Sequence, residues 1–308
     1  MKTARYVLYR FLQSLFALLC IITLTFFLAR LAPGGPFLDE KAIPEHLLEQ
    51  MNKKYGFDKP LAVQYGLYLG QLIQGDLGPS LGNKGFTVKQ VISEGLPVSF
   101  ILGFIGLIIA LIIGVPIGVF AAAKRNTSVD YGLMTVAMIG ICLPTFVIAP
   151  LLGEIFALKL GWFDVAGWEN STAWFLGAMT LGLYYSAYIA RLTRGSMLDV
   201  LSEDFIRTAR AKGVAPGKIL FKHAFRGGIM PVVAYLGPAL AGLIGGSFVV
   251  ETVFGIPGLG QHFIKAASNR DYTLINGTVT VFAILILVMN FLVDVLQAWL
   301  DPRTKTRN

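Results

Sequence analysis

Runs of about 20 apolar residues are the feature that most constrains this chain. They cover residues 11–29, 98–123, 133–158, 173–190, 229–250 and 278–300. An α-helix needs roughly 20 such residues to cross the hydrocarbon core of a bilayer. The chain is also 55% hydrophobic and only 14% charged over 308 residues, which is too apolar for a soluble protein. We therefore predict an all-α integral membrane protein with about six transmembrane helices.

The third run is the least regular of these. Pro144 and Pro150 interrupt it, and Glu154 lies near its end. Proline removes a backbone hydrogen bond from a helix, but neighbouring helices in a membrane bundle can satisfy the freed carbonyl groups. The sequence therefore predicts a single kinked span at this place.

The distribution of Lys and Arg between the runs predicts the topology. Basic residues outnumber acidic ones in residues 1–10, 124–125, 191–226 and 301–308, whereas the intervening segments are together slightly acidic. Cytoplasmic loops are enriched in Lys and Arg, so we predict that both termini are cytoplasmic. This topology explains the net charge of +8, and no nucleic-acid partner is needed.

The chain divides into four parts on this topology. Residues 1–32 form a cytoplasmic N-terminus and the first helix, which we expect to remain uncleaved because no A-x-A site follows it. Residues 33–96 form a small extracytoplasmic cap with short helices near 44–55 and 61–73. Residues 97–300 form a five-helix core with a cytoplasmic loop at 191–226, and residues 301–308 are a cytoplasmic tail.

Groups that could carry catalysis are scarce. His46, His223 and His262 lie in separate loops, no metal-ligand spacing is present, and no phosphate-binding loop of the G-x-x-x-x-G-K-[ST] type occurs. We therefore expect no catalytic, metal or cofactor site in this chain. Glu154 and Asp294 lie inside predicted spans, where a charge is costly, so a proton relay is an alternative to a structural role for each.

Pairs of small residues in two spans predict close helix packing. Gly114 and Gly118 are four residues apart in the second span, as are Gly242 and Gly246 in the fifth. Such pairs let helix backbones approach closely in a membrane bundle. They could also flank a substrate path.

The basic loop at residues 191–226 carries the clearest local pattern. Ser202 as the N-cap, followed by the acids Glu203 and Asp204, is predicted to begin a helix that ends with basic residues before Gly213, in agreement with the helix dipole. A second helical piece follows over residues 218–225. Phe205, Ile206, Ala209 and Val214 supply an apolar face. From the residues alone, this knob could enter a partner's groove or lie on anionic lipid, and both readings remain open.

Four motifs in order resemble the membrane subunits of ABC importers of the peptide and nickel family. They are R-L-A-P-G-G-P-F at residues 30–37, T-A-R-A-K-G at 208–213, E-T-V-F-G-I-P-G-L-G-Q at 251–261 and N-R-D-Y at 269–272. The general family pattern places Glu where this chain has Arg207. The P-G-G-P-F start and the short loop between the third and fourth spans are most similar to the B-type oligopeptide permeases.

This resemblance implies a type I ABC importer fold and a set of partners. The implied partners are a homologous C-type permease, two ATPase subunits and an extracytoplasmic peptide-binding protein, all in a bacterial inner membrane. ATP and Mg would be bound by the ATPase subunits and not by this chain. Dipeptides, glutathione and nickel remain alternative substrates, and a stand-alone secondary transporter is the alternative of a different class.

The resemblance also assigns candidate residues. The ATPase-coupling set would be Asp204, Arg207, Thr208, Ala209, Arg210, Ala211, Lys212 and Gly213. Ala209 and Gly213 would let the helix seat closely on the ATPase, and the basic residues would pair with acidic groups. A receptor-facing or gating loop would contain Glu251, Phe254, Pro257, Gly258 and Gly260, for which plain loop geometry is the alternative.

Overall fold

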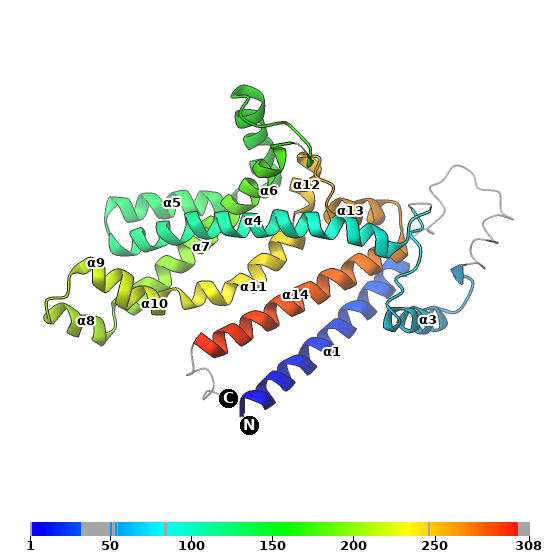
Figure 1. The fold of residues 1–308 in the computed structure, drawn as a ribbon, viewed down its shortest axis with the longest axis horizontal. Coiled ribbons are helices and arrows are strands. Elements are labelled where there is room, and N and C mark those ends of the chain that lie inside the picture. The colour runs from blue at the N-terminus through cyan, green and yellow to red at the C-terminus, as the bar shows by residue number, and fades with distance from the viewer. Residues whose placement is uncertain are drawn as a thin grey trace.

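The computed structural model describes residues 2–31, 50, 53, 55–82, 85–169, 171–245 and 247–300, without the side chains of 2–7 and 296–300. Within these ranges the chain is helical and contains one isolated β-bridge, between Pro79 and Thr87. Figure 1 shows the helices, which are α1 (Lys2–Leu31), α3 (Leu61–Ile73), α4 (Val88–Ala123), α5 (Ser128–Cys142), α6 (Thr145–Leu152), α7 (Ala173–Leu201), α8 (Asp204–Ala211), α9 (Pro216–Lys218), α10 (Phe225–Gly228), α11 (Met230–Gly245), α12 (Phe248–Val253), α13 (Leu259–Ser268) and α14 (Tyr272–Leu300). Two π-helical segments, Gly153–Lys159 and Ile219–Ala224, follow α6 and α9.

The predicted number of spans is roughly confirmed. Four stretches are long and apolar enough to cross a membrane, namely Leu8–Leu31, Val88–Ala123, Met230–Val253 and Tyr272–Val295, and a bent pair of helices adds a fifth. The remaining predicted span, residues 173–190, is helical as part of α7.

The predicted kink in the third span is wrong in degree, because the chain forms two separate helices here. α5 ends at Cys142, Leu143 is extended, and α6 begins after Pro144 at an angle of 103° to α5. A residue before proline is driven out of the helical region, and proline cannot donate the next helical hydrogen bond. Pro150, by contrast, lies inside α6 without ending it. Figure 1 shows α6 leaving the direction of the bundle.

The parallel pair α4 and α7 is the most extensive helix contact in the described part of the bundle. A Cβ added to Gly114 would lie 2.6 Å from the Ser186 carbonyl oxygen, and one added to Gly118 would lie 2.5 Å from the Ala190 carbonyl oxygen. No side chain fits between backbones at this distance. The predicted close approach is confirmed for this pair, whereas Gly246 of the second pair lies outside the described residues.

α4 begins ten residues before the predicted span. Thr87 and Gln90 form a capping box, in which Thr87 Oγ1 accepts from the Gln90 backbone N–H at 3.2 Å and Gln90 Oε1 accepts from the Thr87 N–H at 2.9 Å. The resulting helix has 36 residues. The predicted boundary at residues 96–97 therefore lies inside a continuous helix.

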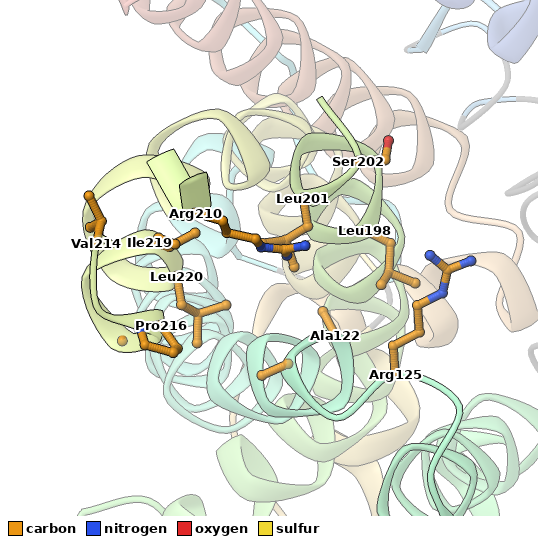
Figure 2. A pocket seen from close by; sticks show the side chains of 12 residues that line it. Ala122, Arg125, Leu198, Leu201, Ser202, Arg210, Val214, Pro216, Ile219 and Leu220 are labelled. Carbon is orange, nitrogen blue, oxygen red and sulfur yellow. The ribbon is translucent and has the colours of Figure 1, made fainter. Parts of the chain in front are cut away.

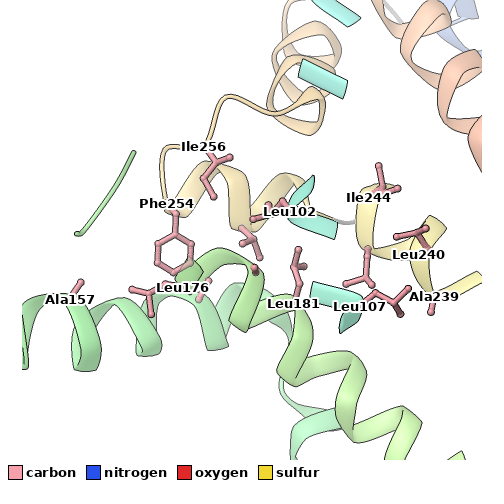
Figure 3. Packing of buried hydrophobic residues seen from close by; sticks show 14 residues of the cluster. Leu102, Leu107, Ala157, Leu176, Leu181, Ala239, Leu240, Ile244, Phe254 and Ile256 are labelled. Atoms are coloured by element: carbon pink, nitrogen blue, oxygen red, sulfur yellow. The ribbon is translucent and has the colours of Figure 1, made fainter. Parts of the chain in front are cut away.

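The main hydrophobic core lies where α4, α7, α11 and the segment after α12 meet. Leu102, Leu176, Leu181 and Ile244 are buried in it together with Phe254. Figure 3 shows the Phe254 ring directed toward α7, beside Leu176. This core connects the turn after α12 to the main helix pair.

The two ends of the bundle carry different small elements. α3, at the predicted residues 61–73, and α13 lie at one end, and α8, α9 and α10 lie at the other (Figure 1). α1 runs antiparallel to α14, and Arg10 and Asp294 form an ion pair between them at 3.4 Å. The start of α1 and the end of α14 thus lie at the same end. The predicted helix at residues 44–55 lies largely outside the described residues.

Candidate functional site

The segment from α8 to α10, residues 204–228, forms a small lobe that we call the coupling lobe. α8 begins at Asp204 after an extended Glu203, so the prediction that Ser202 is the N-cap is wrong. The Ser202 hydroxyl instead donates to the Asp199 carbonyl at 2.7 Å, because Ser202 still caps the C-terminus of α7. The helix carries an acidic residue in its first turn and Arg210 in its last, as the dipole favours.

α8 ends in a Schellman motif built on Gly213, which has φ +73°. The Gly213 N–H donates to the Arg210 carbonyl at 3.0 Å, and the Val214 N–H donates to the Ala209 carbonyl at 3.2 Å. Val214 and Ala209 also join the same hydrophobic cluster, the contact that usually accompanies this motif. The predicted stop glycine is confirmed, and its left-handed conformation explains why glycine is needed.

Hydrophobic contacts hold the coupling lobe on the bundle. Ile206 is fully buried against Val119 and Ala122 of α4 and Met197 of α7, and Ala209 is half-buried in the same cluster. Phe205, predicted to share this apolar face, is 51% exposed. The remaining candidate coupling residues are exposed: Asp204, Arg207, Thr208, Arg210, Ala211, Lys212 and Gly213.

The outward face of α8 is polar and weakly braced. Arg207 Nη1 lies 3.3 Å from Asp204 Oδ1, and both side chains are largely exposed. Such a surface pair contributes about 0.3 to 0.5 kcal/mol between neighbouring turns of a helix. The Arg207 side chain is therefore available to a partner at little energetic cost.

A cavity of about 600 Å³ lies between the coupling lobe and the ends of α4 and α7. Figure 2 shows Arg210, Val214 and Leu220 of the lobe on one side and Ala122 and Leu198 of the bundle on the other. The lobe therefore touches the bundle along part of its inner surface only, and this leaves room for it to shift against α4 and α7.

A buried ion pair that the sequence analysis missed braces the same end of the bundle. Arg194 of α7 donates through Nε to Asp130 Oδ1 at 2.6 Å and through Nη2 to Oδ2 at 2.7 Å. Asp130 is fully buried in the first turn of α5 and also accepts from the Asn126 backbone N–H at 3.0 Å. The bidentate geometry fixes α5 to α7 at the end of the bundle that carries the coupling lobe. Its members are 64 positions apart, so no local pattern reveals the pair.

The turn between α12 and α13, residues 254–258, is organised by the buried carboxylate of Glu251. Ser99 Oγ of α4 donates to Glu251 Oε1 at 2.7 Å, Ser247 Oγ donates to the same atom at 2.5 Å, and the Gln261 N–H donates to Oε2 at 3.2 Å. The Leu259 N–H donates to Ser99 Oγ at 2.9 Å. Glu251 thus caps the N-terminus of α13 and connects it to α4 and α12.

Two glycines allow this carboxylate to lie against the turn. A Cβ at Gly258 would clash with the Glu251 carboxylate, and one at Gly260 would lie 2.7 Å from Phe248 Cβ. Among the five residues predicted for a receptor-facing or gating loop, Glu251, Phe254, Gly258 and Gly260 are buried and Pro257 is exposed. The buried four shape the turn from inside, and Pro257 is the member open to solvent.

Asp271, from the last of the four motifs, organises the neighbouring segment. Its carboxylate accepts from Ser80 Oγ at 2.6 Å and from the Gly82 N–H at 2.9 Å, and it caps α14 through the Leu274 N–H at 3.0 Å. The segment before α4 is thereby fixed to the start of α14. The motif by itself indicates no role for Asp271, because its partners at Ser80 and Gly82 lie far away in the sequence.

The two ionisable residues predicted inside spans both have partners. Glu154 Oε1 lies 3.4 Å from Lys159 Nζ, and Asp294 Oδ2 lies 3.4 Å from Arg10 Nε. These pairs fit the structural alternative for both carboxylates.

Family models match most of the chain. A model described as "Binding-protein-dependent transport system inner membrane component" matches residues 114–306, and one for the N-terminal part of such membrane components matches residues 3–93. The chain belongs to this permease family. The predicted membership among the membrane subunits of ABC importers is confirmed.

Named relatives match this permease over almost its whole length. The oligopeptide transport system permease protein OppB of Salmonella typhimurium is 45% identical over 303 residues, covering 98% of this chain and 99% of that protein. OppB of Escherichia coli (strain K12) is 43% identical over 303 residues, with the same coverage. The dipeptide transport system permease protein DppB of Bacillus subtilis is 42% identical over 302 residues, covering 98% of each chain.

A solved transporter shares the fold of this permease. The methionine ABC transporter MetNI, in an inward-facing conformation, matches with a TM-score of 0.61 at 18% identity, covering 69% of this chain and 97% of the other. The predicted importer-like bundle is confirmed. This permease is therefore a multi-pass inner membrane protein that serves as a transport subunit, with partners of the ABC transporter type.

Proposed function

We propose that this chain is the B-type membrane subunit of an ATP-driven importer for oligopeptides. The observation that carries the proposal is the 45% identity over 98% of the chain to a permease named for oligopeptide transport. The 42% identity to a dipeptide permease supports dipeptides as the second candidate. In this proposal the chain forms half of the translocation path, and a homologous C-type subunit forms the other half.

Each proposed partner has a separate role. Two ATPase subunits bind ATP and Mg, and an extracytoplasmic binding protein delivers the peptide. The coupling lobe faces the cytoplasm together with both termini, and an ATPase docks on the exposed face of α8. Two features support this docking, namely the exposed Arg207 side chain, held only by a surface ion pair, and the capped end of α8 at Gly213.

The coupling lobe transmits ATP-driven motion as one body. Ile206 and its neighbours anchor the lobe on α4 and α7, while the cavity behind α8 leaves one side uncovered. A push on the exposed face therefore reaches the helix pair α4 and α7 through the hydrophobic anchor. This pair is closely packed at Gly114 and Gly118, so its two helices move together.

The proposal is tested by reconstituting the permease with its candidate partners in lipid vesicles. We expect uptake of a labelled tetrapeptide that requires ATP and the binding protein, with weaker competition by dipeptide, glutathione or Ni²⁺. Equal uptake by the purified chain alone would identify a secondary transporter. ATP-driven uptake of Ni²⁺ or glutathione without peptide uptake would reassign the substrate.

The coupling role has a matched pair of variants. Arg207→Glu reverses a charge on the exposed face of α8, and Lys89→Glu makes the same change on an exposed residue at the opposite end of the bundle. We expect the first to reduce copurification of the ATPase and the second to leave it unchanged. Equal copurification for both variants would contradict docking on α8.

A further inference from the structure

A second cavity lies between the C-terminal half of α7 and the start of α11, apart from the coupling lobe. It has a volume of about 320 Å³, and its lining includes Tyr188, Arg191, Gly195, Asp199 and Pro231. We call it the α7–α11 groove. The groove opens on the side of α7 where Arg191, Gly195 and Asp199 are exposed.

The two charged side chains of the α7–α11 groove have no ion-pair partner in the described part of the chain. Arg191 Cζ lies 5.4 Å from the centroid of the Tyr188 ring, and Asp199 contributes only its carbonyl oxygen to a hydrogen bond, from Ser202. Arg194, between them in sequence, is instead engaged with Asp130 on another face of α7. The groove therefore presents one free cation and one free anion of its own chain.

The spacing of these two charges is fixed by the helix. Arg191, Gly195 and Asp199 are four positions apart in turn and so lie along one face of α7. At 1.5 Å of rise per residue, the Cα atoms of Arg191 and Asp199 are about 12 Å apart. Gly195 lies between them, and a Cβ added there would meet no atom within 4 Å. The floor of the groove is thus open between the charges.

Aromatic rings lie beside the α7–α11 groove, whose lining includes Tyr188. The rings of Tyr188 and Tyr235 lie 4.5 Å apart, and Tyr184 and Tyr185 pack edge to face at 5.4 Å. Tyrosine combines an apolar ring with a hydroxyl group, so such a cluster accepts both side chains and backbone amides.

We propose that the α7–α11 groove is a subsite of the translocation path that binds a short peptide by its two charged ends. Arg191 takes the terminal carboxylate, Asp199 takes the terminal ammonium group, and the open strip at Gly195 receives the backbone. An extended chain spans about 3.3 to 3.6 Å per residue, so a separation of about 12 Å fits three to four residues. This inference rests on the proposed function and assigns path residues to it.

The charge pattern explains why a peptide is the occupant. A zwitterionic peptide offers one positive and one negative end at the separation of Arg191 and Asp199. An anionic lipid headgroup would satisfy Arg191 and leave Asp199 next to like charge. A helix of a partner subunit would cover the open strip at Gly195 and exclude water from both charges, which is costly unless each is paired.

The experiment uses the assembled transporter and a thiol placed in the groove. Cys20 and Cys142, both free thiols, are replaced by serine, and Gly195→Cys is introduced. Gly132→Cys on α5 is the matched control, because a Cβ there also meets no atom within 4 Å. The rate of modification by a water-soluble maleimide is measured without peptide, with tetraalanine, and with its N-acetylated and C-amidated forms.

We expect tetraalanine to slow modification at position 195 by at least about twofold, which is the effect expected from the interaction energy of one exposed charge pair. The modification rate of the control thiol should stay unchanged. The N-acetylated or C-amidated peptide protects less, as does dialanine, which is too short to reach both charges. Arg191→Gln abolishes the preference for a free carboxylate, and Asp199→Asn abolishes the preference for a free ammonium group.

Three results would overturn the subsite. The first is equal protection by free and capped peptides, or none. The second is a thiol at position 195 that reacts in the isolated permease but not in the complex, because a partner subunit then covers the groove. The third is protection that follows the anionic lipid content and not the peptide.

Failure of the proposed function gives a different result. If the unmodified complex takes up no tetraalanine with ATP, peptide import itself is refuted. If uptake proceeds but position 195 is not protected, peptide import stands and the subsite alone fails. Arg191→Gln and Asp199→Asn are also compared in uptake, where each should reduce the preference for free over capped peptide by about two- to fivefold, as expected for an exposed charge pair.

Discussion

Gly213→Ala offers a direct test of the rigid end of α8. Gly213 has φ +73°, and a Cβ at this position would contact no atom within 4 Å. The substitution therefore creates no clash, and its cost is purely conformational. A left-handed L-residue costs about 1 to 2 kcal/mol, while alanine lowers the entropy of the unfolded chain by about 0.4 to 1 kcal/mol. We expect a net loss of about 1 kcal/mol, which changes an equilibrium about fivefold.

Gly217→Ala is the matched control on the same lobe. Gly217 lies in α9 without a positive φ, and a Cβ there also meets no atom within 4 Å. Alanine is favoured over glycine by about 0.5 to 1 kcal/mol in a helix. Both variants add one methyl group. They are thus expected to shift the stability of the lobe in opposite directions.

Hydrogen exchange on the purified transporter measures both effects. We expect Gly213→Ala to increase the hydrogen-exchange rates of the backbone amides at positions 213 and 214 about fivefold, because the free energy of local opening falls by about 1 kcal/mol. Gly217→Ala should slow exchange in α9. Equal protection in all three proteins would refute the reasoning that the Schellman motif sets the stability of this end.

The remaining predictions concern packing, capping and pH. Gly118→Ala should lower the melting temperature of the complex, since overpacking costs about 1 to 3 kcal/mol, whereas Gly132→Ala, with open space around its Cβ, should not. Glu251→Gln places an amide donor against donors and should cost about 1 to 3 kcal/mol in unfolding free energy, read by chemical denaturation. Hydrogen bonds from the Thr172 backbone N–H and then its hydroxyl lower the pKa of Asp164 below its ordinary value. The carboxylate therefore stabilises its loop above the ordinary pKa, and this stability is lost as the pH falls through the lowered folded-state pKa; amide exchange in the Asp164→Asn loop should lose that dependence on pH.

Local sequence patterns predicted several elements correctly because their causes are local. The apolar runs located the spans, residues 61–73 formed α3, and Gly213 ended α8. The capping box at Thr87 and Gln90 is equally local, but it precedes the apolar run, so the run alone placed the start of α4 too late. The prediction placed the N-cap of α8 at Ser202, which is wrong. Because α7 continues up to this residue, Ser202 caps the C-terminus of α7 and Glu203 is the N-cap of α8.

The break at Pro144 shows where a local signal becomes ambiguous. Proline predicts a disturbance of the helix, but the same residue is compatible with a small kink or with two separate helices. The angle of 103° depends on what each half packs against, since α5 lies on α7 while α6 also contacts α12. The sequence therefore located the break and left its size undetermined.

The sequence by itself determined the membrane character, the approximate number of spans, the end of α8 at Gly213 and the family, because periodicity, charge and motifs are properties of neighbouring residues. The tertiary structure decided which charges are paired and which are free. Asp130 and Arg194 meet across 64 positions, while Arg191, on the same helix as Arg194, faces an open groove with Asp199. Arg191 and Arg194 are three positions apart, a spacing that keeps side chains close together on a helix surface. Their different partners are therefore set by the packing between helices on either side.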